Sequence, residues 1–173
     1  MDLSAYRINE LKKDEIFDVI KKNDITKMQS LLTSGYNINK DLVDGITPLM
    51  ISTLNCSYEF VELLINSGAN MKLLDIYNNN VLMFAATQGS KALAELIISR
   101  SKIKIDSKNL YGWTALMFAI KFNNLDFARV LLEHNANPNT CLLDGTSALQ
   151  FSIEKNKKDT KLSNLLIDFG AKF

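Results

Sequence analysis

The side chains that most often carry out catalysis or bind metals are sparse in this sequence. It contains one histidine, His134, with no second His or Cys near it, whereas a zinc site needs several ligands. No Ser, Cys or His lies in a recognised nucleophile motif, and the 7 glycines do not cluster into a phosphate-binding loop. We therefore predict no catalytic residue, no cofactor and no metal. An enzyme or metal protein built on a repeat scaffold is the remote alternative.

The overall composition is that of an ordinary globular protein. The 173 residues are 47% hydrophobic and 23% charged, with a net charge of +1. Proteins that bind nucleic acid usually carry a clear basic excess, so no such binding is predicted. The longest apolar run, residues 81–86, is too short to span a bilayer, and residues 1–15 lack the apolar stretch of a signal peptide. We expect a cytoplasmic protein without membrane contact, and secretion as an effector is the alternative.

A four-residue pattern recurs along the chain in steps of 33, 34 and 33 residues. It reads TPLM, NVLM, TALM and SALQ at residues 47–50, 80–83, 114–117 and 147–150. A second series, of apolar residues, follows a similar period: Leu31, Leu64, Ile97, Leu131 and Leu166. The last step of this series is longer, which places about two extra residues in the stretch 155–161. A fixed period of this length predicts stacked supersecondary units.

Each unit reads as a capped helix, a second helix and a turn. The first slot always holds a residue that can accept from the free N–H groups of a helix start: Asp14, Thr47, Asn80, Thr114 and Ser147. A small residue follows inside the first helix in four units, which would let neighbouring helices approach closely: Ser52, Ala85, Ala119 and Ser152. The second helix ends before a residue suited to a left-handed turn: Gly35, Gly68, Asn135 and Gly170. Residues 99–102 lack such a residue, so we expect a distorted turn there.

These residues resemble the ankyrin repeat, most closely at 44–70, where G-x-T-P-L, V-x-L-L and G-A all occur. The resemblance implies an all-α solenoid of about five stacked helix–turn–helix units with hairpin fingers, in a single domain over 1–173. The units are about 10–38 as the N-terminal cap, 39–71, 72–105, 106–138, and 139–173 as the C-terminal cap. The family's usual His after T-P-L is absent, because Met50, Met83, Met117 and Gln150 stand there. A tetratricopeptide array is the competing fold, but it lacks the capped T-P-L start.

The resemblance also implies a function, which is binding a partner protein through the finger tips and the inner helices. The candidate finger residues are Ile46, Ile76, Tyr77, Asn79, Leu110, Tyr111, Trp113 and Asp144, and those at inner-helix ends are Gln88, Lys121 and Phe122. Large aromatic side chains at loop tips are typical of binding hot spots. In the alternative interpretation, the aromatic rings pack on neighbouring fingers and stiffen them, and Phe122 covers the helix pair beneath it.

The biological role has several candidates at this stage. The Met usage resembles that of bacterial ankyrin proteins, so the chain could be an immunity protein that neutralises a toxin, an effector that engages a host protein, or a regulatory subunit. We expect a monomer, with weak self-association through the C-terminal end, around Phe169 and Phe173, as the alternative. Cys56 and Cys141 fall in different units, and we therefore expect them to be free thiols.

Overall fold

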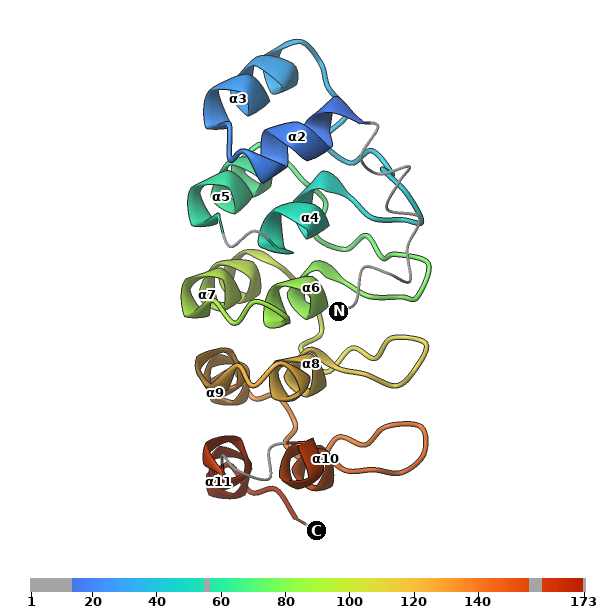
Figure 1. Cartoon of the computed structure of the whole chain (residues 1–173), viewed down its shortest axis with the longest axis vertical. Helices are drawn as coiled ribbons and strands as arrows, with labels where there is room; N and C mark the ends of the chain where they lie inside the picture. Colours follow the sequence, from blue (N-terminus) through green and yellow to red (C-terminus); the bar gives the residue numbers. More distant parts are fainter. Residues whose placement is uncertain (1–13, 55–56, 156–159, 173) are drawn as a thin grey trace.

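The computed structural model describes residues 14–54, 57–155 and 160–172. Helical pairs stack along the long axis of the molecule, and long loops project from one side of the stack (Figure 1). The first helices of the pairs, called inner helices here, are α2 (Glu15–Lys21), α4 (Pro48–Leu54), α6 (Val81–Ala86), α8 (Ala115–Lys121) and α10 (Ala148–Lys155). The outer helices are α3 (Ile25–Thr33), α5 (Tyr58–Asn66), α7 (Lys91–Arg100), α9 (Leu125–Glu133) and α11 (Lys161–Asp168). The predicted all-α solenoid is confirmed.

The inner helices begin at the residues that the repeat predicts. The side chain of each first-slot residue accepts a hydrogen bond from a backbone N–H of the first turn: Asp14, Thr47, Asn80, Thr114 and Ser147. The last unit adds a reciprocal bond, because Gln150 Oε1 accepts from the backbone N–H of Ser147 at 3.0 Å. Such a capping box satisfies two free donors at once. The predicted helix starts are therefore confirmed.

The outer helices end as the sequence predicts, with a left-handed residue after four of them and a different turn after α7. Left-handed residues with φ of 87°, 89°, 66° and 88° follow four of these helices, at Gly35, Gly68, Asn135 and Gly170. Helix α7 is instead followed by its C-cap residue Ser101 in extended backbone, with φ −109° and ψ 160°. In the last unit α10 ends at Lys155 and α11 begins at Lys161. The longer connection thus lies where the extra residues were predicted, although residues 156–159 are outside the described ranges.

Small residues allow the inner helices to pack closely on one another. Each inner helix contacts the next one along the stack, and the predicted small slot is fully buried in all four units: Ser52, Ala85, Ala119 and Ser152. The two hydroxyl groups in this slot are satisfied, because Ser52 Oγ donates to the Leu49 carbonyl at 2.7 Å and Ser152 Oγ lies 2.9 Å from Ser163 Oγ. Neighbouring units therefore share one continuous core, as a solenoid requires.

The C-terminal end of the stack leaves one recurring core position open. This slot is no more than 1% exposed in the first four units, at Ile20, Thr53, Ala86 and Ile120. In the last unit the same slot holds Ile153, which is 41% exposed. The difference arises because each earlier residue is covered by the following unit, whereas α10 and α11 are the last helical pair of the described residues (Figure 1).

The remaining predictions about single residues concern thiols and membranes. Cys141 is a half-buried free thiol, as predicted, and Cys56 lies outside the described residues. Within those residues, no helix has both the length and the apolar character needed to cross a membrane.

Candidate protein-binding surface

Buried polar side chains hold the tips of the middle fingers. We number the fingers 1 (residues 36–46), 2 (69–79), 3 (102–113) and 4 (136–146). In finger 2 the Asp75 carboxylate accepts from the backbone N–H groups of Tyr77 and Asn79 at 2.8 and 2.7 Å. Asn109 has the same role in finger 3, where its Oδ1 accepts from the backbone N–H of Tyr111 at 2.9 Å.

Hydrogen bonds also link one finger to the next. Asn109 Nδ2 donates to Asn79 Oδ1 at 2.8 Å, and both residues are buried. The backbone N–H of Ile76 donates to the Asp44 carbonyl at 2.9 Å, and that of Leu110 donates to the Tyr77 carbonyl at 3.0 Å. Because each bond crosses from one finger to its neighbour, the first three fingers form a connected row rather than independent loops.

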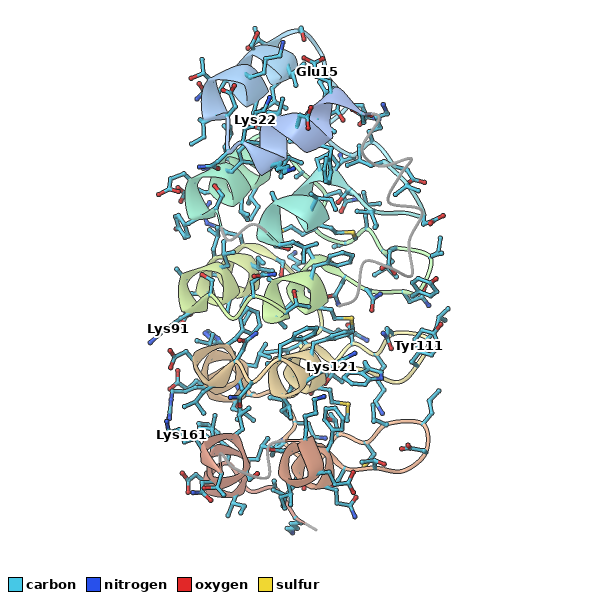
Figure 2. The ribbon with its side chains drawn as sticks, in the orientation of Figure 1. Glu15, Lys22, Lys91, Tyr111, Lys121 and Lys161 are labelled. Carbon is cyan, nitrogen blue, oxygen red and sulfur yellow. The ribbon has the colours of Figure 1, made fainter. Side chains whose placement is uncertain are left out.

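Large apolar side chains stand exposed at the tips of this row. We define the tip row as Ile76, Leu110, Tyr111 and Leu143, which are 50%, 55%, 56% and 75% exposed. Tyr111 points outward from finger 3 in Figure 2. Exposed apolar side chains that gather along one edge are typical of interaction sites. The structure therefore gives the predicted Ile76, Leu110 and Tyr111 a common surface.

Leu143 is absent from the sequence-based set, which took Asp144 at this finger instead. The repeat period could have identified Leu143, because Leu143 follows Leu110 by one period and Leu110 follows Ile76 by another. Asp144 is also exposed, and the backbone N–H of Thr146, which donates to its carboxylate at 2.9 Å, lowers the pKa of Asp144.

Two predicted contact residues are buried, so the prediction that they lie at exposed finger tips is wrong. Ile46 is fully buried and Asn79 is 3% exposed. Both occupy the position just before the helix cap. The Asn79 side chain donates to Asp75 Oδ2 and accepts from Asn109 Nδ2, each at 2.8 Å, and Ile46 belongs to the hydrophobic core. Trp113 has the same position in its unit and is half-buried, with its ring centroid 5.2 Å from that of Phe118.

The aromatic residues of the fingers divide between the two interpretations that the sequence left open. The half-buried ring of Tyr77 lies 5.9 Å from that of Tyr111 on the next finger, so Tyr77 braces the row. Trp113 reaches the following unit, where its ring lies edge-on to Phe151 at a centroid distance of 5.2 Å. The exposed Tyr111 keeps most of its surface available to a partner.

The three predicted residues at inner-helix ends remain accessible. Gln88 is exposed, and Lys121 at the end of α8 is half-buried. Phe122 is 38% exposed. The Lys121 ammonium lies 5.1 Å from the Trp113 ring centroid and 5.7 Å from that of Phe122, which groups the three side chains. We call this group the Lys121 platform.

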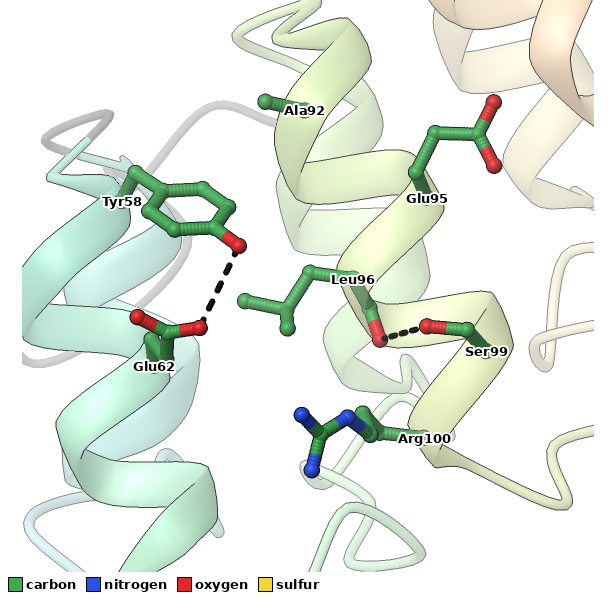
Figure 3. A pocket seen from close by; sticks show the side chains of 7 residues that line it. All are labelled: Tyr58, Glu62, Ala92, Glu95, Leu96, Ser99 and Arg100. Atoms are coloured by element: carbon green, nitrogen blue, oxygen red, sulfur yellow. Dashed lines mark hydrogen bonds between the residues drawn. The ribbon is translucent and has the colours of Figure 1, made fainter.

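A pocket lies between the outer helices α5 and α7 (Figure 3), which are on the side of the stack opposite the fingers (Figure 1). Several of its polar groups have partners within the chain. The Tyr58 hydroxyl donates to Glu62 at 3.3 Å, and Glu95 lies 3.0 Å from Nε2 of the exposed His134. Burial and the neighbouring Glu62 raise the pKa of Tyr58, so its hydroxyl stays protonated near neutral pH. Most of the residues that line the pocket are polar or charged, whereas the tip row exposes large apolar side chains on consecutive fingers, so we take the tip row as the candidate surface.

Among the described residues, no group of three or more His, Cys, Asp or Glu side chains could hold a metal ion. The features that distinguish this molecule are therefore its repeated units and the surface that its fingers present. A family model of ankyrin repeats (3 copies) matches residues 16–109 and again 82–173. The chain belongs to the ankyrin repeat family.

Relatives with similar sequences include proteins of bacteria, viruses and eukaryotes. The ankyrin repeat protein YahD of Escherichia coli (strain K12) is 25% identical over 149 residues, which are 83% of this chain and 73% of YahD. The ankyrin repeat protein R664 of Acanthamoeba polyphaga mimivirus is 30% identical over 135 residues, covering 76% of this chain and 80% of R664.

A third relative is a much larger enzyme. The phosphocholine transferase AnkX of Legionella pneumophila is 31% identical over 130 residues, or 73% of this chain but only 14% of AnkX. The match therefore spans a small part of that protein. Ankyrin repeats generally mediate protein–protein interactions, and the family is generally a non-enzymatic binding scaffold.

Proposed function

We propose that this chain is a non-enzymatic scaffold that binds one partner protein through the tip row and the neighbouring inner-helix ends. The observation that supports this most directly is the tip row itself, with four large apolar side chains at least half exposed on consecutive fingers. A solvent-exposed apolar row carries a hydrophobic cost that burial against a partner would relieve. The protein is proposed to act in the cytoplasm.

The binding mechanism is rigid complementarity. Hydrogen bonds between fingers and the buried side chains of Asp75 and Asn109 order the tips before any partner arrives. A preordered surface loses little conformational entropy on binding, so more of the contact free energy appears as affinity. Tyr111 is the expected hot spot, because a Tyr supplies a large contact area with few rotatable bonds.

The test is partner capture followed by comparison of variants. A tagged chain is used to purify complexes from the native lysate, and the partner is identified by mass and then produced for direct binding measurements. Leu110→Ser combined with Tyr111→Ser should weaken binding by more than about tenfold, as loss of a hot spot does. Lys91→Ala on the outer helix α7 is the matched control, since Lys91 is exposed away from the fingers.

Both variants change exposed side chains, so the fold should persist, and circular dichroism checks it. A folded tip variant that binds the captured partner as tightly as the wild type would reject the tip row as the binding surface. The identity of the partner also distinguishes the proposed roles. A bacterial toxin supports an immunity protein, and a host protein supports an effector.

A second, weaker interaction is self-association through the C-terminal end. The exposed Ile153, in a slot that every earlier unit buries, favours it. Ile167 and Phe169 at the end of the chain are also exposed, at 49% and 37%. Contact between the ends of two chains would cover these side chains, and the Discussion gives its test.

A further inference from the structure

The Lys121 platform carries an unneutralised charge beside Trp113, the last residue of finger 3. The Lys121 ammonium lies over the rings of Trp113 and Phe122. Aromatic faces attract a cation but supply no counter-charge. Within the described part of the chain, the ion pairs are those of Lys27, Lys40 and His134, and Lys121 makes none.

Lys121 is an isolated charge on the inner helices of the middle units. The inner helices α4, α6 and α8 have the sequences PLMISTL, VLMFAA and ALMFAIK, in which Lys121 is the one ionisable residue. One period further along, the same slot holds Glu154 on α10, which is exposed. Glu154 forms no ion pair with Lys121 in the structure, so the ammonium remains available to an incoming group.

The platform is held rigidly enough to act as a recognition point. Trp113 contacts Phe118 in its own unit and Phe151 in the next, each at a centroid distance of 5.2 Å. The backbone N–H of Trp113 also donates to Asn109 Oδ1 at 2.9 Å. The ring over which Lys121 lies is thus fixed by two units and one finger, which restricts where the ammonium can go.

We propose that the partner presents an acidic side chain to Lys121, flanked by apolar side chains that contact the tip row. This deepens the proposed function and rests on it. A carboxylate would pair with an ammonium whose surroundings are two aromatic rings rather than water alone, and an ion pair strengthens as the local dielectric falls. The apolar tip row supplies the adjoining contact area, so an acidic residue without apolar neighbours would bind weakly.

The probe is a library of random linear peptides displayed on phage, selected against the whole chain. Trp113 is the one tryptophan of the sequence, so a change in its fluorescence reports whether a selected peptide reaches the platform. We expect the selected peptides to be enriched in Asp or Glu beside apolar residues. Affinity for a selected peptide should fall about fivefold in Lys121→Met, which keeps an unbranched apolar side chain over Trp113 and removes the charge.

Two further variants make the test specific to the charge. Selection against Lys121→Glu should enrich Lys and Arg in place of Asp and Glu. Glu154→Gln is the matched control, because it removes a charge from the same slot one unit away and should leave the acidic preference in place. Circular dichroism of the free variants verifies that they stay folded.

The outcomes separate this inference from the proposed function. Selected peptides that require Tyr111 and Leu110 but show no acidic preference would overturn the role of Lys121. The same holds if selection against Lys121→Met still enriches Asp and Glu. Either result leaves the tip row as the proposed binding surface. If no selected peptide depends on the tip row, the proposed binding surface and this inference both fail.

Discussion

Two buried hydroxyl groups of the described residues, those of Tyr36 and Thr140, have no hydrogen-bond partner. A buried polar group without a partner loses its hydration and gains nothing in return. Burial, with a smaller contribution from the charge of Asp14, raises the pKa of Tyr36, so its hydroxyl stays protonated at neutral pH. Thr140 allows a direct test, because Val has almost the same shape as Thr and has no hydroxyl.

We predict that Thr140→Val leaves the free energy of unfolding unchanged or raises it by up to about 1 kcal/mol. Thr114→Val is the matched comparison, since Thr114 is also buried but its Oγ1 accepts from the backbone N–H of Met117 at 3.3 Å. Losing this helix cap should cost about 1–2 kcal/mol. Urea unfolding followed by circular dichroism measures both. Equal destabilisation by the two substitutions would show that the Thr140 hydroxyl has a partner after all.

At the scale of single residues, local chemistry was predictable from the sequence and long-range burial was not. The helix caps and the left-handed turn residues depend on neighbours within a few positions, so the repeat revealed them. The burial of Asn79 depends on Asn109, 30 positions away, and no local pattern shows that contact. Ile46 was misplaced because it is close to the fingertip in sequence while its side chain is buried in the core.

At the scale of the elements, the fingers are spaced so closely that one backbone position has no room for a side chain. Gly45, with φ +79°, faces the next finger, and a Cβ built there would lie 2.7 Å from the Asp75 Cα. Gly145 occupies the same slot in finger 4, with φ +87°. A Cβ built on Gly145 would have no neighbouring atom within 4 Å. The two glycines therefore share the backbone conformation and differ in the presence of a neighbour.

This pair separates backbone strain from the packing of the fingers. We predict that Gly145→Ala costs about 1 kcal/mol, the strain of a left-handed alanine. Gly45→Ala should cost about 1–3 kcal/mol more, because finger 1 would have to move away from the Asp75 backbone. Thermal or urea unfolding of both variants measures the difference. Similar losses for the two would mean that fingers 1 and 2 separate easily and that the row is not rigid.

The sequence predicted the elements well because a repeat tests each assignment several times. Caps, small slots and turns recur at the same positions, and the exception at α7 was visible as a missing glycine. The hydrogen bonds between fingers were not predicted. They depend on the lateral spacing of the units, and the sequence gives only the distance along the chain.

At the scale of the whole molecule, the stack has a period but also two ends, and the ends differ from the middle. A position that is core in one unit becomes surface in the last unit, because burial in a solenoid comes from the neighbouring unit. The repeat predicts that Ile120 and Ile153 are equivalent. Ile120 is buried and Ile153 is exposed because the two residues differ in their position along the stack. The sequence pattern of a single unit carries no information about that position.

The last prediction uses this contrast to test self-association. Ile120→Lys places a charge in a fully buried slot and should destabilise the protein by about 3–5 kcal/mol or prevent folding. Ile153→Lys places the same charge in the same slot at the open end, so the free energy of unfolding should change by no more than about 0.5 kcal/mol.

Sedimentation velocity over a range of concentrations then measures association. We expect the wild type to associate weakly and Ile153→Lys to remain monomeric, because a charge in the contact would be buried without a partner. If the two proteins sediment alike at every concentration, the C-terminal end makes no contact between chains, and the exposed Ile153 has no role in association.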